Sequence, residues 1–171
     1  MAVARGALPE PADFAPPPSP AQLATWDEAD RFARPARLAR LRARFAEAGV
    51  DAYFGLRREH MRYLSGFTLA QGEEPSAGNS GQFLVTADET VVLADSRYRL
   101  QAQRQAPEWR IAEAYRDLPT RWPDLLAAVG AKRVAVEADV VTHADWERLA
   151  AAARDVELVP AGAWLATDRA T

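Results

Sequence analysis

The sequence predicts an α/β domain: a mixed β-sheet of about six strands, with one antiparallel hairpin and with helices on both faces. Short runs rich in β-branched and aromatic residues alternate with segments whose apolar residues recur every three or four positions. Two of the runs, 82–86 and 90–94, are separated only by Ala-Asp-Glu, a spacing typical of a hairpin. Alternating units interrupted by one hairpin indicate a sheet that mixes parallel and antiparallel pairs.

The N-terminal region predicts an arm that is separate from the folded body. Half of the twelve prolines stand in the first twenty residues, where each removes a backbone donor and restricts the chain to extended conformations. Residues 21–33 look like a short amphipathic helix that docks on the body. We therefore expect an arm with a docking helix over 1–33 and a folded domain over 34–171.

A helix is expected from Pro35, because Leu38, Leu41, Phe45 and Ala48 recur at steps of three and four, and Gly49 can end it in the left-handed conformation. Arginines flank this apolar stripe, but acidic residues dilute them. We interpret them as a solvated helix face and not as a nucleic-acid site.

The remaining elements follow in chain order. We expect a strand at 50–55, a helical turn at 57–64, the hairpin, a helix capped by Ser96 that ends near 106, a strand at 110–114, a helix at 120–129, a strand at 133–137, a helix capped by Thr142 and a strand at 156–159. The chain after Pro160 is too short to add another layer. If the face bearing Trp146, Leu149, Ala150 and Ala153 is core, Trp146→Ala should cost about 3–5 kcal/mol.

Composition and charge exclude several classes of function. The chain has 21 Lys+Arg against 24 Asp+Glu, a net charge of −3, so it offers no basic surface for a nucleic acid or an anionic membrane. Its apolar runs are shorter than the ~20 residues of a membrane span, and its start lacks the apolar region of a secretory signal. It has no cysteine, which suits a reducing compartment. These features predict a cytoplasmic protein.

The residues show no complete catalytic motif. His143 and Glu147 are one helical turn apart, but no third metal ligand is evident. No G-x-S-x-G turn is present, and the run from Gly78 to Gly81 precedes a strand and is therefore not a phosphate-binding loop. Two segments remain as candidates, 57–67 and 94–98, which crowd cationic and aromatic side chains beside strand ends. The alternative for them is structural: a surface ion pair of Arg97 with Asp95 or Glu89, and packing of Tyr63 and Tyr98.

These segments resemble the N-terminal domain of the creatinase, prolidase and aminopeptidase P family of metallopeptidases. The resemblance rests on five motifs in order, from about Arg37 to Pro160: Arg40-Leu-Arg with Gly49-Val-Asp-Ala52, Arg62-Tyr-Leu-Ser-Gly-Phe67, Leu93-Ala-Asp-Ser-Arg-Tyr98, Ala131-Lys-Arg-Val-Ala-Val-Glu137 with Trp146-Glu-Arg-Leu149, and Val156-Glu-Leu-Val-Pro160. The loop at 68–80, with Glu73 and Glu74, is larger than the short Gly-Ser link in many relatives, and the Pro-rich arm has no counterpart in the pattern.

The resemblance implies a non-catalytic role for this chain. In the family the chemistry belongs to a following domain, whose carboxylates and histidine hold two divalent metals, often manganese, and activate a water against the bond before proline. The N-terminal domain serves assembly with its own catalytic domain and with other subunits, and shapes the rim of the active site. The implied rim residues are His60, Arg62, Tyr63, Arg97 and Tyr98. His60 replaces a more usual Asn or Asp, which allows a rim charge that depends on pH.

We therefore expect the N-terminal domain of an Xaa-Pro aminopeptidase or prolidase-like enzyme, inactive alone, as a homodimer or larger homo-oligomer. Either a piece of a longer protein or a stand-alone copy fits this expectation. The alternatives are an independent module that binds a small carboxylate or a protein through the region of Arg62 and Arg97, and the N-terminal domain of a creatinase-type amidinohydrolase.

Overall fold

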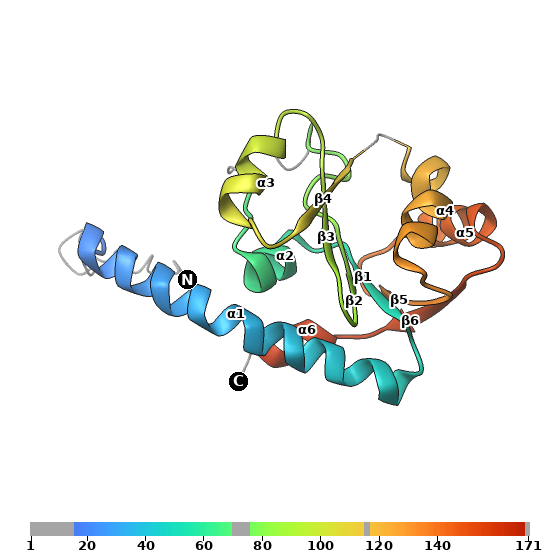
Figure 1. Cartoon of the computed structure of the whole chain (residues 1–171), viewed down its shortest axis with the longest axis horizontal. Coiled ribbons are helices and arrows are strands. Elements are labelled where there is room, and N and C mark those ends of the chain that lie inside the picture. The colour runs from blue at the N-terminus through green and yellow to red at the C-terminus, as the bar shows by residue number, and fades with distance from the viewer. Residues whose placement is uncertain (1–15, 70–75, 115–116, 170–171) are drawn as a thin grey trace, which may run out of the picture.

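The computed structural model describes residues 16–69, 76–114 and 117–169, which form a mixed sheet with helices on both faces (Figure 1). The sheet has six strands in the order β4-β3-β2-β1-β5-β6. Strand β2 is antiparallel to both of its neighbours, and the other pairs are parallel. The predicted fold class is confirmed. The strands are β1 Ala52–Gly55, β2 Phe83–Thr86, β3 Thr90–Ala94, β4 Arg110–Glu113, β5 Arg133–Glu137 and β6 Glu157–Ala161.

The helices divide between the two faces of the sheet. One face packs against α1, α2, α3 and α6, and the other against α4 and α5. The central strands are buried on both sides, which explains why they read as continuous apolar runs and not as alternating ones. The helices are α1 Pro20–Ala48, α2 Arg58–Ser65, α3 Arg99–Gln105, α4 Leu118–Val129, α5 His143–Ala152 and α6 Trp164–Arg169.

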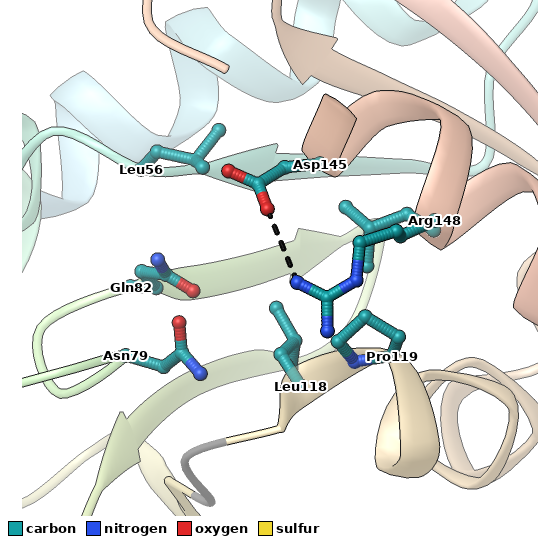
Figure 2. Close-up of a pocket in the computed structure, with 8 residues that line it drawn as sticks. Leu56, Asn79, Gln82, Leu118, Pro119, Asp145 and Arg148 are labelled. Carbon is teal, nitrogen blue, oxygen red and sulfur yellow. Dashed lines mark ion pairs between the residues drawn. The ribbon is translucent and has the colours of Figure 1, made fainter. Parts of the chain in front are cut away.

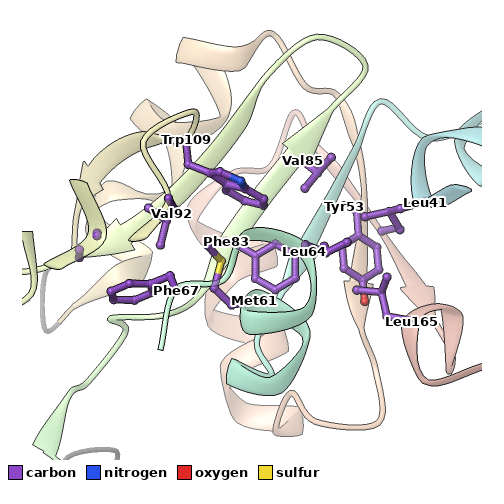
Figure 3. Close-up of a cluster of buried hydrophobic side chains, with 14 of the residues drawn as sticks. Leu41, Tyr53, Met61, Leu64, Phe67, Phe83, Val85, Val92, Trp109 and Leu165 are labelled. Carbon is purple, nitrogen blue, oxygen red and sulfur yellow. The ribbon is translucent and has the colours of Figure 1, made fainter. Parts of the chain in front are cut away.

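Alternation along β1 and β2 sends neighbouring side chains to different cores. Tyr53 and Phe83 enter the core beneath α1, α2 and α6, together with Met61 (Figure 3). Phe54 and Leu84 point the other way into the core beneath α4 and α5, where the rings of Phe54 and Trp122 lie 4.7 Å apart. Two separate cores therefore hold the sheet from its two sides.

Helix α1 corrects the expectation of a separate docking helix at 21–33. It is continuous over 29 residues and passes through Pro35. Ser19 begins it with a capping box, in which its side chain accepts from the Gln22 N–H and the Gln22 side chain accepts from the Ser19 N–H. Helix-favouring Ala, Gln, Leu, Glu and Arg then carry the helix up to the proline, which occupies an exposed position. The helix ends at Gly49, as predicted, with φ of 62°.

The first half of α1 does not dock on the body. Leu23, Trp26 and Phe32 are 46%, 57% and 90% exposed. The part of the predicted arm at 1–15 lies outside the described residues, as do Glu73 and Glu74 of the predicted loop.

Two further expectations are wrong. Ser96 does not cap α3, because residues 95–98 form a turn in which the Asp95 carbonyl accepts from the N–H groups of Tyr98 and Arg99. The last strand does not end at 159 but continues through Pro160, because β6 is an edge strand where a missing N–H costs no ladder bond. Helix α6 follows and adds to the layer of α1.

The short helix α6 is anchored by two side chains. Leu165 is fully buried, and the Trp164 ring stacks on Tyr53 with 5.7 Å between centroids. The six residues of α6 therefore pack onto the same core as the much longer helix α1.

The cap of α5 is confirmed, since the Thr142 side chain accepts from the Asp145 N–H. Its predicted core face is only partly right. Leu149 is buried, whereas Trp146 is only partly buried at the margin of the core. The loss in the free energy of unfolding expected for Trp146→Ala is therefore smaller than the about 3–5 kcal/mol predicted for a core residue.

We expect Trp122→Ala to lower the free energy of unfolding by about 3–5 kcal/mol, because this ring is fully buried between the sheet and α4. Trp146→Ala is the matched control and should cost clearly less. Urea unfolding followed by circular dichroism measures both. Equal losses for the two variants would show that the core beneath α4 and α5 is misassigned.

Candidate functional site

The two segments singled out in the sequence begin at the same edge of the sheet. All strands except β2 run in one direction, so their carboxyl ends meet at this edge. Segment 57–67 follows β1, and segment 94–98 follows β3. Ligand groups in α/β proteins gather at such edges, because the connections there are free to carry polar side chains.

A buried carboxylate organises the centre of this edge. Glu137 ends β5 and is 1% exposed. Its Oε2 accepts from the backbone N–H groups of Leu56 at 2.6 Å and Arg57 at 2.8 Å. Its Oε1 accepts from the Tyr53 hydroxyl at 2.7 Å and contacts His60 Nδ1. The side chain therefore ties the end of β5 to β1 and to the start of α2.

The groups around Glu137 change the pKa of its carboxyl in opposite directions. Burial alone would raise the pKa of this carboxyl, but hydrogen bonds from His60, Tyr53 and the Arg57 N–H outweigh burial and hold the pKa below its ordinary value. Burial, with the Glu137 charge beside it, raises the pKa of the Tyr53 hydroxyl. Tyr53 is thus a neutral donor and Glu137 a charged acceptor.

His60 is the inner member of α2 and does not face solvent. It is 4% exposed and directed at Glu137, so the expected rim charge that varies with pH has no exposed side chain to carry it. Sequence reasoning named His60 but missed its partner. The available signal was an acidic residue closing the apolar run Val-Ala-Val in a buried strand, because a carboxylate in such a place needs donors.

Arg62 and Tyr63 lie on the outer side of α2, toward α1. Arg62 is exposed and lines a groove of about 830 Å³ between the first half of α1 and the end of α3. Tyr63 is partly buried beneath the Arg37 guanidinium, 4.2 Å from the ring centroid, and its hydroxyl accepts from Arg40 Nη2 at 3.1 Å. The structure therefore brings these two predicted residues together beside α1.

The need for a glycine in the Arg-Tyr-Leu-Ser-Gly-Phe motif is steric. Gly66 ends α2 with φ of 84°, and a Cβ there would lie 2.2 Å from Arg34 Nη2. Arg34 occupies this space to donate to the Ser65 carbonyl at 2.7 Å while it pairs with Asp30. The motif is thus the place where α1 is fastened to α2.

Arg97 and Tyr98 form a second group after β3. Arg97 Nη2 donates to Asp95 at 2.6 Å and to the Ser76 carbonyl at 3.0 Å. The hydrogen bond from Arg97 to the Asp95 carboxylate holds the pKa of Asp95 below its ordinary value. The guanidinium lies 5.0 Å from the Tyr98 ring centroid, and that ring is 5% exposed. The ion pair with Asp95 weighed from the sequence is confirmed, whereas Glu89 pairs with Arg110.

A small polar cavity of about 120 Å³ lies at the same edge, between the start of β2 and α5 (Figure 2). Arg148 and Asp145 pair across it at 3.5 Å, and Arg148 also pairs with Asp117 at 2.8 Å. The Gln82 Oε1 is buried here, and no partner for it occurs among the described residues. The local charges are thus largely neutralised within the chain.

The described ranges contain no group of three side chains suited to hold a metal ion. His143 and Glu147 approach to 3.4 Å, but their side chains are 86% and 68% exposed. Two exposed ligands do not fit a two-metal centre, which requires several converging carboxylates. Within those ranges, no helix is both long and apolar enough to cross a bilayer.

Comparisons with known proteins agree with this architecture. Residues 37–171 match the model of the creatinase/prolidase N-terminal domain. The chain therefore belongs to the creatinase/prolidase N-terminal domain family. It is the N-terminal, creatinase-like domain type found in Xaa-Pro aminopeptidases and prolidases.

Individual relatives show how this domain relates to longer proteins. The chain is 28% identical to the uncharacterized peptidase YqhT of Bacillus subtilis over 124 residues, which cover 72% of this chain and 33% of that protein. It is 35% identical to a probable Xaa-Pro aminopeptidase P of Phaeosphaeria nodorum over 117 residues, 67% of this chain and 15% of that one. The chain thus spans a third or less of the curated relatives it matches.

One solved structure is covered almost completely by this chain. The N-terminal domain of the cytoplasmic peptidase PepQ from Mycobacterium tuberculosis superposes with a TM-score of 0.64 at 32% identity, covering 77% of this chain and 97% of that chain. Domains of this kind therefore form ordered structures when separated from the rest of their protein.

We expect Glu137→Gln to destabilise the domain at pH 7 by about 1–3 kcal/mol, because a charged acceptor of four hydrogen bonds is replaced by a neutral amide. The pKa of Glu137 is lowered by folding, so its contribution is present above the unfolded pKa and is lost as pH falls through the folded pKa. The difference between the two proteins should therefore shrink below about pH 4.

Denaturant unfolding between pH 3 and pH 7 measures this difference. Glu157→Gln is the matched control, because that side chain is 60% exposed in its pair with Arg133 and should change stability little. A Glu137→Gln protein as stable as the parent at pH 7 would contradict the role of the buried carboxylate.

Proposed function

We propose that this domain works as the non-catalytic N-terminal part of an Xaa-Pro aminopeptidase or prolidase-like enzyme. The observation that carries the proposal is the pattern of coverage: the chain accounts for 97% of a solved N-terminal domain but only 33% of the peptidase YqhT. A domain of this size that matches one end of longer peptidases is best explained as the support for chemistry located elsewhere. Residues 34–171 form the functional unit, and 1–33 are an addition to it.

In the proposed enzyme the catalytic domain holds two divalent metals, with manganese the first choice, and cleaves the bond before a proline at the second position. The residues described here do not fit such a centre, so no step of the reaction is assigned to them. The absence of cysteine and the cytoplasmic PepQ relative favour the cytoplasm as its place of action.

The rim residues divide into two kinds in this proposal. Arg62 and Arg97 are exposed and carry planar donors suited to a peptide carboxylate or carbonyl, so they are the groups proposed to meet substrate. Tyr63 is held against α1 by Arg37 and Arg40, beside the exposed Arg62. His60 and Tyr98 are buried and act as positioning residues beneath the rim.

A second candidate function is an independent module that binds a small carboxylate or a protein. The groove favours it, since Arg31, Arg62 and Arg104 line its walls together with Trp26. The gene downstream of codon 171 separates the candidates. Codons for a metal-binding domain support the peptidase, and an immediate stop supports the module.

We expect the 171-residue chain with Mn²⁺ and an Xaa-Pro peptide to give no turnover above a chelator-treated sample. The protein extended by its downstream codons should hydrolyse the peptide but not creatine. Release of the N-terminal residue by the 171-residue chain alone would contradict the proposal. Hydrolysis of creatine by the longer protein would instead support a creatinase-type parent.

In that longer protein, Arg62→Ala and Arg97→Ala should each raise KM several-fold and leave kcat nearly unchanged, because they remove binding contacts at the rim. Arg121→Ala is the matched control, since this exposed arginine lies on α4 at the opposite face. A KM unchanged in both rim variants would remove these residues from the proposed rim.

A further inference from the structure

Helix α1 has a second apolar face, opposite the one that packs on the sheet. Its residues follow one another at alternating steps of three and four, the spacing of the contact positions in a coiled coil. All are exposed, and Phe32 is 90% exposed. We call this the Phe32 face; it consists of Ala29, Phe32, Ala36, Ala39, Ala43 and Ala46.

Helix propensity does not account for this face. Exposed alanines alone would be explained by their preference for helices, but phenylalanine has no such preference and gains nothing from standing in water. The apolar contacts of α1 with the body lie on its other side, where Leu41 and Phe45 enter the core, and Arg37 donates to the Tyr63 carbonyl from that side. The body therefore does not cover the Phe32 face.

Part of this face lies before the residues that the family model matches. The family match begins at residue 37, whereas α1 begins at Pro20. In Figure 1 this first part of α1 projects beyond the rest of the domain. A contiguous apolar stripe on such a projection is the kind of surface that marks an interaction site.

We propose that the Phe32 face is the contact surface of a dimer in which the α1 helices of two copies pack antiparallel about a two-fold axis. In such a pairing, the layer that holds Phe32 is completed by the partner's Ala36, and the layer that holds Ala29 by the partner's Ala39. A large side chain then meets a small one, and the alanines let the helix axes approach to the short end of the usual 8–10 Å range. The surface is self-complementary, as a two-fold contact requires.

The charges beside the face select the antiparallel orientation. Glu28 and Arg42 lie on the same flank, one towards each end. An antiparallel pair places Glu28 opposite the partner's Arg42, twice, whereas in a parallel pair each flank faces the partner's other flank and these opposite charges do not meet. Arg42 donates its Nε to the Thr86 carbonyl at 2.8 Å, and a guanidinium has further donors for a second acceptor.

This inference names a surface for the subunit assembly expected from the sequence, and it goes beyond the proposed function. It makes no use of peptidase chemistry. An experiment on the 171-residue chain therefore tests it separately from the turnover assay.

We expect the 171-residue chain to sediment as a dimer at micromolar concentration and the Phe32→Glu variant to dissociate at least ten-fold more readily. Phe32 is exposed, so its replacement should leave the thermal unfolding of the domain unchanged at low concentration. Leu100→Glu is the matched control, because Leu100 is a 56% exposed apolar residue on α3, away from the face. A monomeric parent, or a Phe32→Glu variant that dimerises like the parent, would overturn the proposal.

Introduced thiols test the orientation, since the chain has no cysteine of its own. Oxidation of the Ala29→Cys/Ala39→Cys variant should link two chains, because the antiparallel pairing places these positions opposite each other. Each single variant should link poorly, since its two copies would be ten residues apart along the axis, roughly 15 Å. Efficient linkage of the single variants would indicate a parallel pair and overturn the antiparallel arrangement.

Discussion

The arrangement of the candidate site depends on one buried carboxylate. Glu137 binds the backbone of Leu56 and Arg57 and two side chains, so a single residue at the end of β5 sets the direction in which the chain leaves β1 and enters α2. A buried charge is tolerated only when donors surround it, and removing it would leave those donors without an acceptor. The position of Arg62 on the outer side of α2 follows from that of His60 on its inner side.

The same edge of the sheet shows a structural use for many of the arginines of this domain. Several arginines near this edge hold elements together: Arg34 and Arg37 fasten α1 to α2, and the predicted rim residue Arg97 pairs with Asp95 in the turn after β3. Arginine suits this work because its fork of donors reaches several carbonyls at once. An outside partner can still reach the groove beside Arg62, the exposed part of Arg97 and the Phe32 face.

Much of the fold could be predicted because local patterns and tertiary demands coincide. The hairpin, the buried strand at 133–137, the Gly49 stop and the Thr142 cap depend on neighbouring residues, and each is found where the sequence indicated. The errors occur where local signals compete. Pro35 signals a break, yet the helix on either side continues through it. Pro160 signals an end, yet an edge strand tolerates it.

The sequence by itself determined the fold class and the family, because hydrophobic periodicity and the ordered motifs are properties of the chain read in one dimension. The tertiary structure alone decided which of the candidate residues are available to a partner. His60 and Tyr98 are buried while Arg62 is exposed, since burial depends on which element packs above a residue and not on its own identity. The pairing of Glu137 with His60, 77 residues apart, likewise exists only after β1 and β5 lie side by side.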